Sequence, residues 1–377
     1  MDYRTWPTYS LREVGTIVTG STPSTKDPEN YSFEDYCFIK PSDISSSGIT
    51  EIKDSEFHIS RKAFSQSRRL PAGSVLTTCI GIIGKVGILQ KEATCNQQIN
   101  ALIPNRGFDP SFLAYAILSK KTELQELANA PVVPIINKKT FSELRLRIPE
   151  LPVQLSIAKE LNLLAEIIDK KNAQLRDLDA LAQSIFYEMF GDPVTNEKGW
   201  PTAQLSSVST LLNGRAYKQD ELLNTGKYRV LRVGNFFTNS NYYYSDLELE
   251  DDKYCDNGDL LFAWSASFGA FIWSGEKVIY HYHIWKVLFD NARLNKEFYR
   301  FLLNTMTSSF LNDVHGIGMV HLTKAGMEQY VLPIPPMEKQ EEFANKIASI
   351  EKQRTVIQAS LDGANQLLTS RMSFYFE

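Results

Sequence analysis

Residues 154–190 read QLSIAKELNLLAEIIDKKNAQLRDLDALAQSIFYEMF. Apolar side chains recur along this stretch in alternating steps of three and four, which places them on one narrow stripe of a helix. Such a stripe predicts a partner helix of similar length, packed nearly parallel or antiparallel to the first. We predict that the seam between the two helices contains Leu161, Leu164, Ile168, Leu175, Leu178 and Ile185.

A second stretch with the same spacing lies 186 positions further along the chain, counted from Leu161 to Ile347. Cationic residues interrupt both stripes, Lys171 in the first and Arg354 in the second. A single apolar stripe is more often the core face of an ordinary helical bundle, but a duplicate in the same phase favours a coiled coil formed within the chain. The second seam is predicted at Ile347, Ile350, Ile357, Leu361 and Leu368.

The composition is that of an ordinary globular protein. The 377 residues are 43% hydrophobic and 22% charged, which suits two or three domains. The sequence contains no secretory signal pattern and no apolar run long enough to span a membrane, so we expect a cytoplasmic protein. The four cysteines are far apart and lack Cys-x-x-Cys spacing, which indicates reduced thiols and argues against a thiolate zinc site.

The net charge of −4 conceals two regions without acidic residues. Residues 277–289 place Lys277 and Lys286 among tyrosine, histidine and tryptophan side chains. Because nucleic-acid binding depends on local charge and not on the total, these regions predict a DNA partner. The other region, residues 59–91, contains Arg61, Lys62, Arg68, Arg69, Lys85 and Lys91.

Short motifs also repeat along the chain. Trp6-Pro7-Thr8 recurs as Trp200-Pro201-Thr202, and helical patterns at residues 110–127 and 296–310 correspond. A repeat of this length indicates a duplicated domain, and short β-rich runs entered by glycine turns occur in both copies. We therefore predict the α/β class (mixed α+β). The expected organisation is a globular module at residues 1–150, a long helix at 151–192, a second module at 193–336 and a second long helix at 337–377.

Motifs for catalysis are missing. A DNA amino-methyltransferase would need Asn or Asp followed by Pro-Pro and an aromatic residue, and each Asp-Pro pair of this chain lacks the second proline. Residues 81–87 resemble a phosphate-binding loop, but Val86 stands where Ser or Thr would reach magnesium. Nucleophile-turn and zinc-protease motifs do not occur either. We expect no catalytic activity, no cofactor and no metal.

His281 and His283 form a His-x-His motif. On a strand the two rings would lie on one face and could begin a metal site. Their counterparts in the first copy are Asn96 and Gln98, which bind metals poorly. This comparison favours a hydrogen-bonding role, either to base edges of DNA or inside the protein.

Several of these motifs together resemble a known family, the specificity subunits of type I restriction-modification systems. The resemblance covers essentially the whole chain. The second copy departs from it at Gly214-Arg215-Ala216, where the family has Gly-x-Thr-Pro, and this bears on the bases that the copy reads. The motifs that carry the resemblance are Gly20-Ser21-Thr22-Pro23-Ser24, Lys40-Pro41-Ser42-Asp43-Ile44, Ile83-Gly84-Lys85-Val86, Asn96-Gln97-Gln98-Ile99-Asn100, Ile136-Asn137-Lys138-Lys139, Ile148-Pro149, Phe186-Tyr187-Glu188-Met189-Phe190-Gly191-Asp192-Pro193, Ser267-Phe268-Gly269-Ala270 and His281-Tyr282-His283-Ile284.

The resemblance implies a non-catalytic DNA-binding subunit. Each module would be a target recognition domain that reads one half of a split DNA sequence, and the long helices would form an antiparallel coiled coil. Two modification subunits that bind S-adenosylmethionine would carry out methylation, and restriction (motor-nuclease) subunits would join for cleavage. The expected partners are therefore double-stranded DNA and these subunits.

Basic residues near loops are expected to contact phosphates, and polar residues beside them are expected to contact base edges. In the first module the candidates are Ser21, Thr22, Lys26, Lys40, Ser42, Asp43, Arg61, Lys62, Arg68, Arg69, Lys85, Asn96, Gln98 and Lys138. In the second module they are Arg215, Lys218, Arg232, Asn235, Ser265, Ser267, His281 and His283.

Two alternatives come from other functional classes. A coiled-coil scaffold could use its two modules to bind proteins, but the acid-free stretches with aromatic residues favour DNA. A free-standing methyltransferase is disfavoured because the cofactor-binding and amine-binding motifs are missing.

Overall fold

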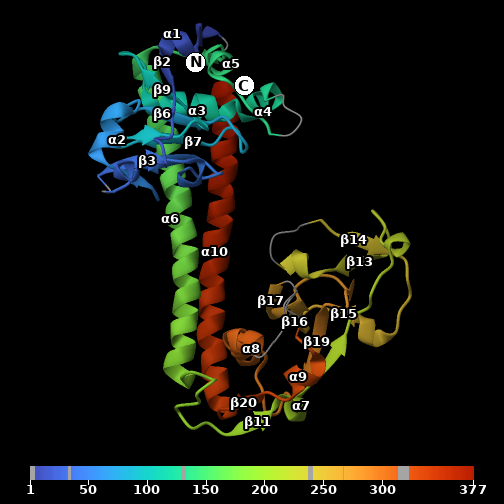
Figure 1. The fold of residues 1–377 in the computed structure, drawn as a ribbon. Helices are drawn as coiled ribbons and strands as arrows, with labels where there is room; N and C mark the ends of the chain where they lie inside the picture. The colour runs from blue at the N-terminus through green and yellow to red at the C-terminus, as the bar shows by residue number, and fades with distance from the viewer. Residues whose placement is uncertain (1–4, 33–34, 129–132, 237–240, 266, 313–321) are drawn as a thin grey trace. The chain divides into compact units, whose positions relative to one another are not determined.

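The computed structural model describes residues 5–32, 35–128, 133–236, 241–265, 267–312 and 322–377. The chain forms two compact units. Unit 1 contains Met1–Ala173 and Ile357–Glu377, and unit 2 contains Gln174–Val356. Each of the two long helices therefore contributes one half to each unit. Figure 1 shows the fold, with the long helices α6 (green) and α10 (red).

The globular part of unit 1 is built from short strands and helices. Its strands are β1 (Thr8–Ser10), β2 (Gly15–Thr19), β3 (Tyr36–Ile39), β4 (Ile49–Ile52), β5 (His58–Ile59), β6 (Val75–Thr78), β7 (Val86–Leu89), β8 (Thr94–Cys95), β9 (Ile99–Pro104) and β10 (Arg145–Arg147). Its short helices are α1 (Leu11–Val14), α2 (Arg61–Gln66), α3 (Pro110–Ser119), α4 (Lys121–Leu127) and α5 (Lys138–Ser142).

Three sheets organise these strands. The largest has the order β2-β9-β6-β7-β4, the second has the order β5-β3-β8, and β1 pairs with β10. Strand β3 runs parallel to β8, with Phe38 opposite Thr94 and Ile39 opposite Cys95. The main core lies between the large sheet and α3, and Leu368, Met372, Tyr375 and Phe376 of α10 pack against it.

Unit 2 repeats this plan. Its strands are β11 (Thr202–Gln204), β12 (Ser209–Asn213), β13 (Tyr228–Leu231), β14 (Tyr243–Ser245), β15 (Tyr254–Cys255), β16 (Leu260–Ser265), β17 (Ser267–Ile272), β18 (Val278–Tyr280), β19 (Ile284–Phe289) and β20 (Val331–Pro333). Its short helices are α7 (Leu205–Val208), α8 (Lys296–Asn312) and α9 (Lys324–Glu328).

The sheets of unit 2 correspond to those of unit 1. The order β12-β19-β16-β17 matches β2-β9-β6-β7, and the order β14-β13-β18-β15 contains the counterparts of β5-β3-β8. Strand β13 again runs parallel to β18, with Leu231 opposite Tyr280. Both units therefore bring the same chain segments together, which confirms the predicted mixed α/β class and the internal repeat.

The long helices are α6 (Leu151–Phe190) and α10 (Met337–Phe376), and they pair antiparallel. In unit 1, Glu160 near the start of α6 forms an ion pair with Arg371 near the end of α10. In unit 2, Asp179 forms an ion pair with Arg354, and Met189 contacts Lys346. The partners on α10 thus descend as the position on α6 rises. All the predicted seam residues lie buried or half-buried.

Helix boundaries follow local chemistry. Gly191 has a φ of 74°, a left-handed conformation that favours glycine, and it ends α6. The helical pattern at residues 110–127 predicted a single helix, and this prediction was wrong. A break at Lys120 divides the segment into α3 and α4. Within the described parts of the chain, none of the helices combines the length and apolar character needed to cross a membrane.

Candidate nucleic-acid interface

Three loop segments of unit 1 meet where β2, β3 and β8 end. The amide of Ser21 donates to the carbonyl of Cys95 (2.9 Å), and the amide of Asn96 donates to the carbonyl of Ile39 (3.0 Å). A Cβ atom added to Gly20 would lie 2.0 Å from the carbonyl oxygen of Asn96, so only glycine fits there. We call these segments, residues 20–22, 40–43 and 96–98, the first turn cluster.

Asn96 and Gln98 hold one segment of the first turn cluster in shape. The Oδ1 atom of Asn96 accepts the backbone amide of Gln98 (3.1 Å), and its Nδ2 atom donates to the side-chain Oε1 of Gln98 (2.8 Å). Asn96 is buried, whereas Gln98 is half-buried. Asn96 therefore shapes the turn, and Gln98 is the member of the pair nearer to solvent.

The segment after β3 is held mainly by Asp43. Its two carboxylate oxygens accept the amides of Lys40 (2.7 Å) and Glu56 (2.8 Å). The ammonium of Lys40 lies 3.0 Å from the ring centroid of Phe57, a cation–π contact that positions this half-buried side chain. Ser42 is exposed. Asp43 therefore shapes this segment through hydrogen bonds to the backbone.

Unit 2 contains the same arrangement with different side chains. The amide of Arg215 donates to the carbonyl of Tyr280 (3.0 Å), and the amide of His281 donates to the carbonyl of Leu231 (2.9 Å). A Cβ atom on Gly214 would lie 2.4 Å from the carbonyl oxygen of His281. Asn235 takes the part of Asp43, because its Oδ1 accepts the amide of Arg232 (2.8 Å). We call residues 214–215, 232–235 and 281–283 the second turn cluster.

His281 and His283 lie in the turn between β18 and β19, so the prediction that they share a strand face was wrong. The turn closes through the amide of Ile284, which donates to the carbonyl of His281 (3.0 Å). The ring Nδ1 of His281 accepts the amide of His283 (3.4 Å), the same bond that Asn96 makes in unit 1. The two rings still approach, with centroids 4.8 Å apart.

His281 is uncharged at neutral pH. Burial, together with electrostatic interactions with His283 and Arg232, lowers the pKa of His281 to about 4. Because its Nδ1 accepts a hydrogen bond, the ring proton resides on Nε2, which remains a donor. Trp264 packs edge-on against His283 (centroids 5.1 Å apart), and its indole donates to the carbonyl of Tyr282 (2.9 Å).

The basic residues of the acid-free region 59–91 differ in their surroundings: some are paired or buried, and others are exposed. Lys62 forms ion pairs with Asp27 (3.0 Å) and Glu29 (2.5 Å), although residues 59–91 contain no acid. Lys85 is buried and donates to the carbonyl of Pro41 (2.9 Å), so it supports the first turn cluster from inside. The arginines of this stretch, Arg61, Arg68 and Arg69, are exposed, as are Lys62 and Lys91. Elsewhere in the unit, Thr22, Lys26 and Lys138 are exposed.

The candidate DNA-binding residues of unit 2 also include paired, buried and exposed side chains. Arg215 is half-buried and makes a bidentate ion pair with Glu221 (2.7 and 2.8 Å). Ser265 is buried and Ser267 is half-buried. Lys218 and Arg232 are exposed, and the guanidinium of Arg232 lies 5.2 Å from the ring of Tyr243.

Two buried glutamines had not been predicted to matter. Gln154 donates from Nε2 to the carbonyl of Pro149 (2.8 Å), and Gln340 donates to the carbonyl of Pro335 (2.7 Å). They fix the start of α6 and α10 to the preceding strand connection. The available signal was their spacing, because each lies five residues after a proline and they are 186 positions apart, as are the helix seams.

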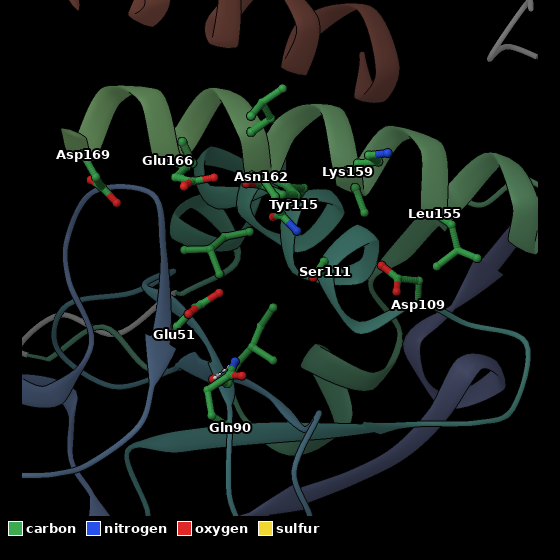
Figure 2. A pocket seen from close by; sticks show the side chains of 15 residues that line it. Glu51, Gln90, Asp109, Ser111, Tyr115, Leu155, Lys159, Asn162, Glu166 and Asp169 are labelled. Atoms are coloured by element: carbon green, nitrogen blue, oxygen red, sulfur yellow. Dashed lines mark hydrogen bonds between the residues drawn. The ribbon is translucent and has the colours of Figure 1, made fainter. Parts of the chain in front are cut away.

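A groove of about 870 Å³ lies in unit 1 between α6, α3 and the β4–β7 edge. Figure 2 shows Leu155, Lys159, Asn162, Glu166 and Asp169 along α6, facing Glu51 and Gln90 from the sheet. The exposed Leu155 and Leu163 add apolar surface. Carboxylates outnumber the single lysine of the lining, so this groove repels DNA phosphates.

Comparisons with known proteins give a consistent result. A family model described as "Type I restriction modification DNA specificity domain" matches the chain twice, over residues 3–177 and 197–363. The type I restriction enzyme MjaIX specificity subunit of Methanocaldococcus jannaschii is 25% identical over 394 residues, which cover 95% of this chain and 91% of that protein. The HindI specificity subunit of Haemophilus influenzae is 27% identical over 184 residues, which cover 46% of this chain and 40% of that protein.

Two solved structures share the fold. The S subunit of the type I restriction-modification system from M. genitalium superimposes with a TM-score of 0.60 at 12% identity, covering 99% of this chain and 96% of that chain. A chain from a structural study of complex assembly and conformational transition of the type I R-M system gives a TM-score of 0.57 at 15% identity, covering 99% of this chain and 97% of that chain.

Proposed function

We propose a reading role for the two turn clusters, because the chain belongs to the type I restriction-modification DNA specificity family. Each cluster would read one part of a two-part DNA target. The modules would be residues 1–150 and 193–336, and the segments 151–192 and 337–377 would be the spacers between them. The chain is the DNA sequence-specificity subunit of its system, and the proposal concerns which of its residues do the reading.

One observation carries this assignment, namely the same hydrogen-bonded framework with different side chains on it. Asn96 and His281 each receive the amide two residues further on, and both follow the end of a parallel strand. A shared framework places the side chains alike, whereas amides and imidazoles offer different donors and acceptors to base edges. Each unit would thus present its own set of hydrogen-bond donors and acceptors to the DNA from equivalent turns.

The proposed base readers are uncharged polar side chains of the clusters that are exposed or half-buried. In unit 1 these are Thr22, Ser42 and Gln98, and in unit 2 they are Asn235, His281 and His283. The exposed guanidinium groups of Arg61 and Arg69 and the ammonium groups of Lys26, Lys138 and Lys218 would contact phosphates and set the register. Lys40 and Arg232, each held over an aromatic ring, would take the same role close to the turns.

We propose that the chain does no chemistry itself. Two modification subunits would bind S-adenosylmethionine and transfer the methyl group, and restriction subunits would join for cleavage. The groove beside α6 supports a docking site for a modification subunit, because Leu155 and Leu163 offer apolar contacts beside the carboxylates of Glu51 and Asp169. The matching partner surface would be an apolar segment flanked by Lys or Arg.

The test uses the chain assembled with its modification subunit and duplexes that contain the methylated site. Replacing Gln98 by Ala should weaken discrimination at one part of the site, and replacing His283 by Ala should weaken it at the other part, each by roughly 1–3 kcal/mol per affected base pair. Matched controls are Gln125→Ala and Asn291→Ala, which remove exposed polar side chains outside the clusters. A protein-binding scaffold would show no sequence-dependent DNA retention in any variant.

A further inference from the structure

Three potential metal ligands meet in unit 1, away from the loop tips of the first turn cluster. Cys37 lies on β3, Asp54 follows β4, and His58 lies on β5 directly opposite Cys37. The Cys37 Sγ is 3.1 Å from the Asp54 Oδ1 and 3.7 Å from the His58 Nε2. The His58 Nε2 is 3.0 Å from the same Asp54 Oδ1. These atoms form a triangle of one sulfur, one nitrogen and one oxygen, with the longest side between sulfur and nitrogen.

The size of the triangle fits one face of a zinc tetrahedron. Zinc binds thiolate at about 2.3 Å, imidazole at about 2.0–2.1 Å and carboxylate at about 2.0–2.2 Å. At tetrahedral angles, ligand atoms held at these bond lengths are roughly 3.3–3.6 Å apart. The three separations in unit 1 lie within about half an ångström of this range, so small side-chain shifts suffice to bind the ion.

We propose that Cys37, Asp54 and His58 form a zinc site, with water in the fourth position. A thiolate with an imidazole selects zinc over the hard cations magnesium and calcium. On binding, the Cys37 thiol releases its proton to solvent and the sulfur donates a lone pair to Zn²⁺, while neutral His58 and ionised Asp54 donate theirs without losing a proton. The absence of Cys-x-x-Cys spacing had argued against such a site, because its ligands come from three separate segments.

Lys91 would compete with the zinc ion for the Asp54 carboxylate. Its ammonium lies 3.2 Å from the Asp54 Oδ1, where it supplies positive charge beside the carboxylate. The Asp54 Oδ1 therefore lies within reach of the Cys37 thiol, the His58 ring and the Lys91 ammonium at once. The Lys91 side chain is half exposed and can swing into solvent when Zn²⁺ arrives.

The site would stiffen one turn cluster and leave the other unchanged. Strand β3 continues directly into residues 40–43, and Asp43 bonds to Glu56 between the two ligands Asp54 and His58. In unit 2 the position that corresponds to Cys37 is Arg229, which forms an ion pair with Glu276 (3.0 Å). This consequence rests on the proposed function of the clusters, whereas the metal site itself does not.

The experiment titrates the full chain, freed of metal by a chelator, with Co²⁺ and then with Zn²⁺. We expect one equivalent of Co²⁺ to give thiolate-to-metal charge-transfer absorption that Zn²⁺ abolishes. Cys37→Ser, His58→Gln and Asp54→Asn should each lower the Zn²⁺ affinity at least tenfold in calorimetry, whereas Lys91→Met should raise it. The matched control Cys255→Ala removes a buried thiol of unit 2, which is not part of the proposed site, and should leave the Zn²⁺ affinity unchanged.

The exposed Asp54 keeps the test decisive if a buried variant misfolds. Asp54→Asn changes one solvent-facing oxygen to nitrogen, and circular dichroism confirms that the fold persists. Absence of the charge-transfer band, or a band that survives Cys37→Ser, would overturn the site. If the Lys91→Met variant bound Zn²⁺ more weakly than the wild-type chain, the cluster would be an ion-pair network and not a zinc site. Loss of DNA recognition with intact metal binding would count against the proposed readers and not against the zinc site.

Discussion

Gln154 and Gln340 make equivalent sets of three hydrogen bonds at the starts of α6 and α10. Each side-chain amide donates to two backbone carbonyls, and each side-chain oxygen accepts one backbone amide, that of Asp109 (2.9 Å) or Asn295 (2.8 Å). Both side chains are fully buried. Each glutamine thus fastens a long helix to the loop that precedes α3 or α8 and to the proline connection before the helix.

Replacing either glutamine by leucine should destabilise the unit in which it lies. The near-isosteric leucine leaves a buried amide and two carbonyls without a partner, and each such group costs about 1–3 kcal/mol. We expect the free energy of unfolding to fall by at least about 2 kcal/mol in chemical denaturation. The exposed Gln174 and Gln366 provide controls on the same helices, and an equal loss in those variants would refute the anchoring role.

Replacing His281 by Asn should flatten the dependence of stability on pH. In the folded chain the pKa of His281 is about 4, below its ordinary value of 6.5, so between these values the unfolded chain binds the additional proton. Stability from this group is therefore complete above pH 6.5 and is lost as the pH falls toward 4. Asn keeps an acceptor for the amide of His283, as Asn96 does in unit 1. Denaturation midpoints at several pH values compare the two proteins, and parallel curves would contradict this assignment.

Reversing the charge of Arg61 and Arg69 together should weaken DNA binding and reduce its salt dependence. Each lost phosphate contact lowers the slope of log K against log salt by about 0.9. Lys62→Met is the control, because Lys62 already pairs with Asp27 and Glu29 and contributes little free positive charge. Binding is measured over a series of salt concentrations. Equal effects of the Lys62 and arginine variants would mean that this surface lies away from the DNA.

A chain that ends at Asp192 should form a homodimer. Unit 1 buries Leu368, Met372, Tyr375 and Phe376 of α10 against its core, and the truncation removes them. At the corresponding positions of α6, a second copy supplies Ala182, Phe186, Met189 and Phe190. We expect a dimer by light scattering and a monomer when Leu175 and Leu178 are changed to Asp. A stable wild-type monomer would show that the helix seam does not drive the pairing.

The long helices were predictable because their apolar spacing is a local property of the sequence. The repeat was equally visible, since motifs such as Trp6-Pro7-Thr8 recur in the same order. His281 and His283 were placed on a strand because alternating residues suit one, whereas the backbone bond from Ile284 to His281 makes a turn there. Short polar segments carry too little periodicity to separate these two conformations.

Charge pairing across the fold could not be read from the sequence. Lys62 finds Asp27 and Glu29 more than thirty positions away, and Lys85 points inward to the Pro41 carbonyl. Both had counted as free charges in a stretch without acids. The cluster of Cys37, Asp54 and His58 was hidden for the same reason, because only the pairing of β3 with β5 brings the ligands together.

The most direct measurement maps methylated positions in DNA modified by the chain together with its modification subunits. The account predicts a motif of two specified parts separated by unspecified bases. Exchanging His281 and His283 for Asn and Gln, the side chains of the first turn cluster, should then alter one part and leave the other unchanged. A continuous motif, or a change in both parts, would contradict the assignment of one reader to each unit.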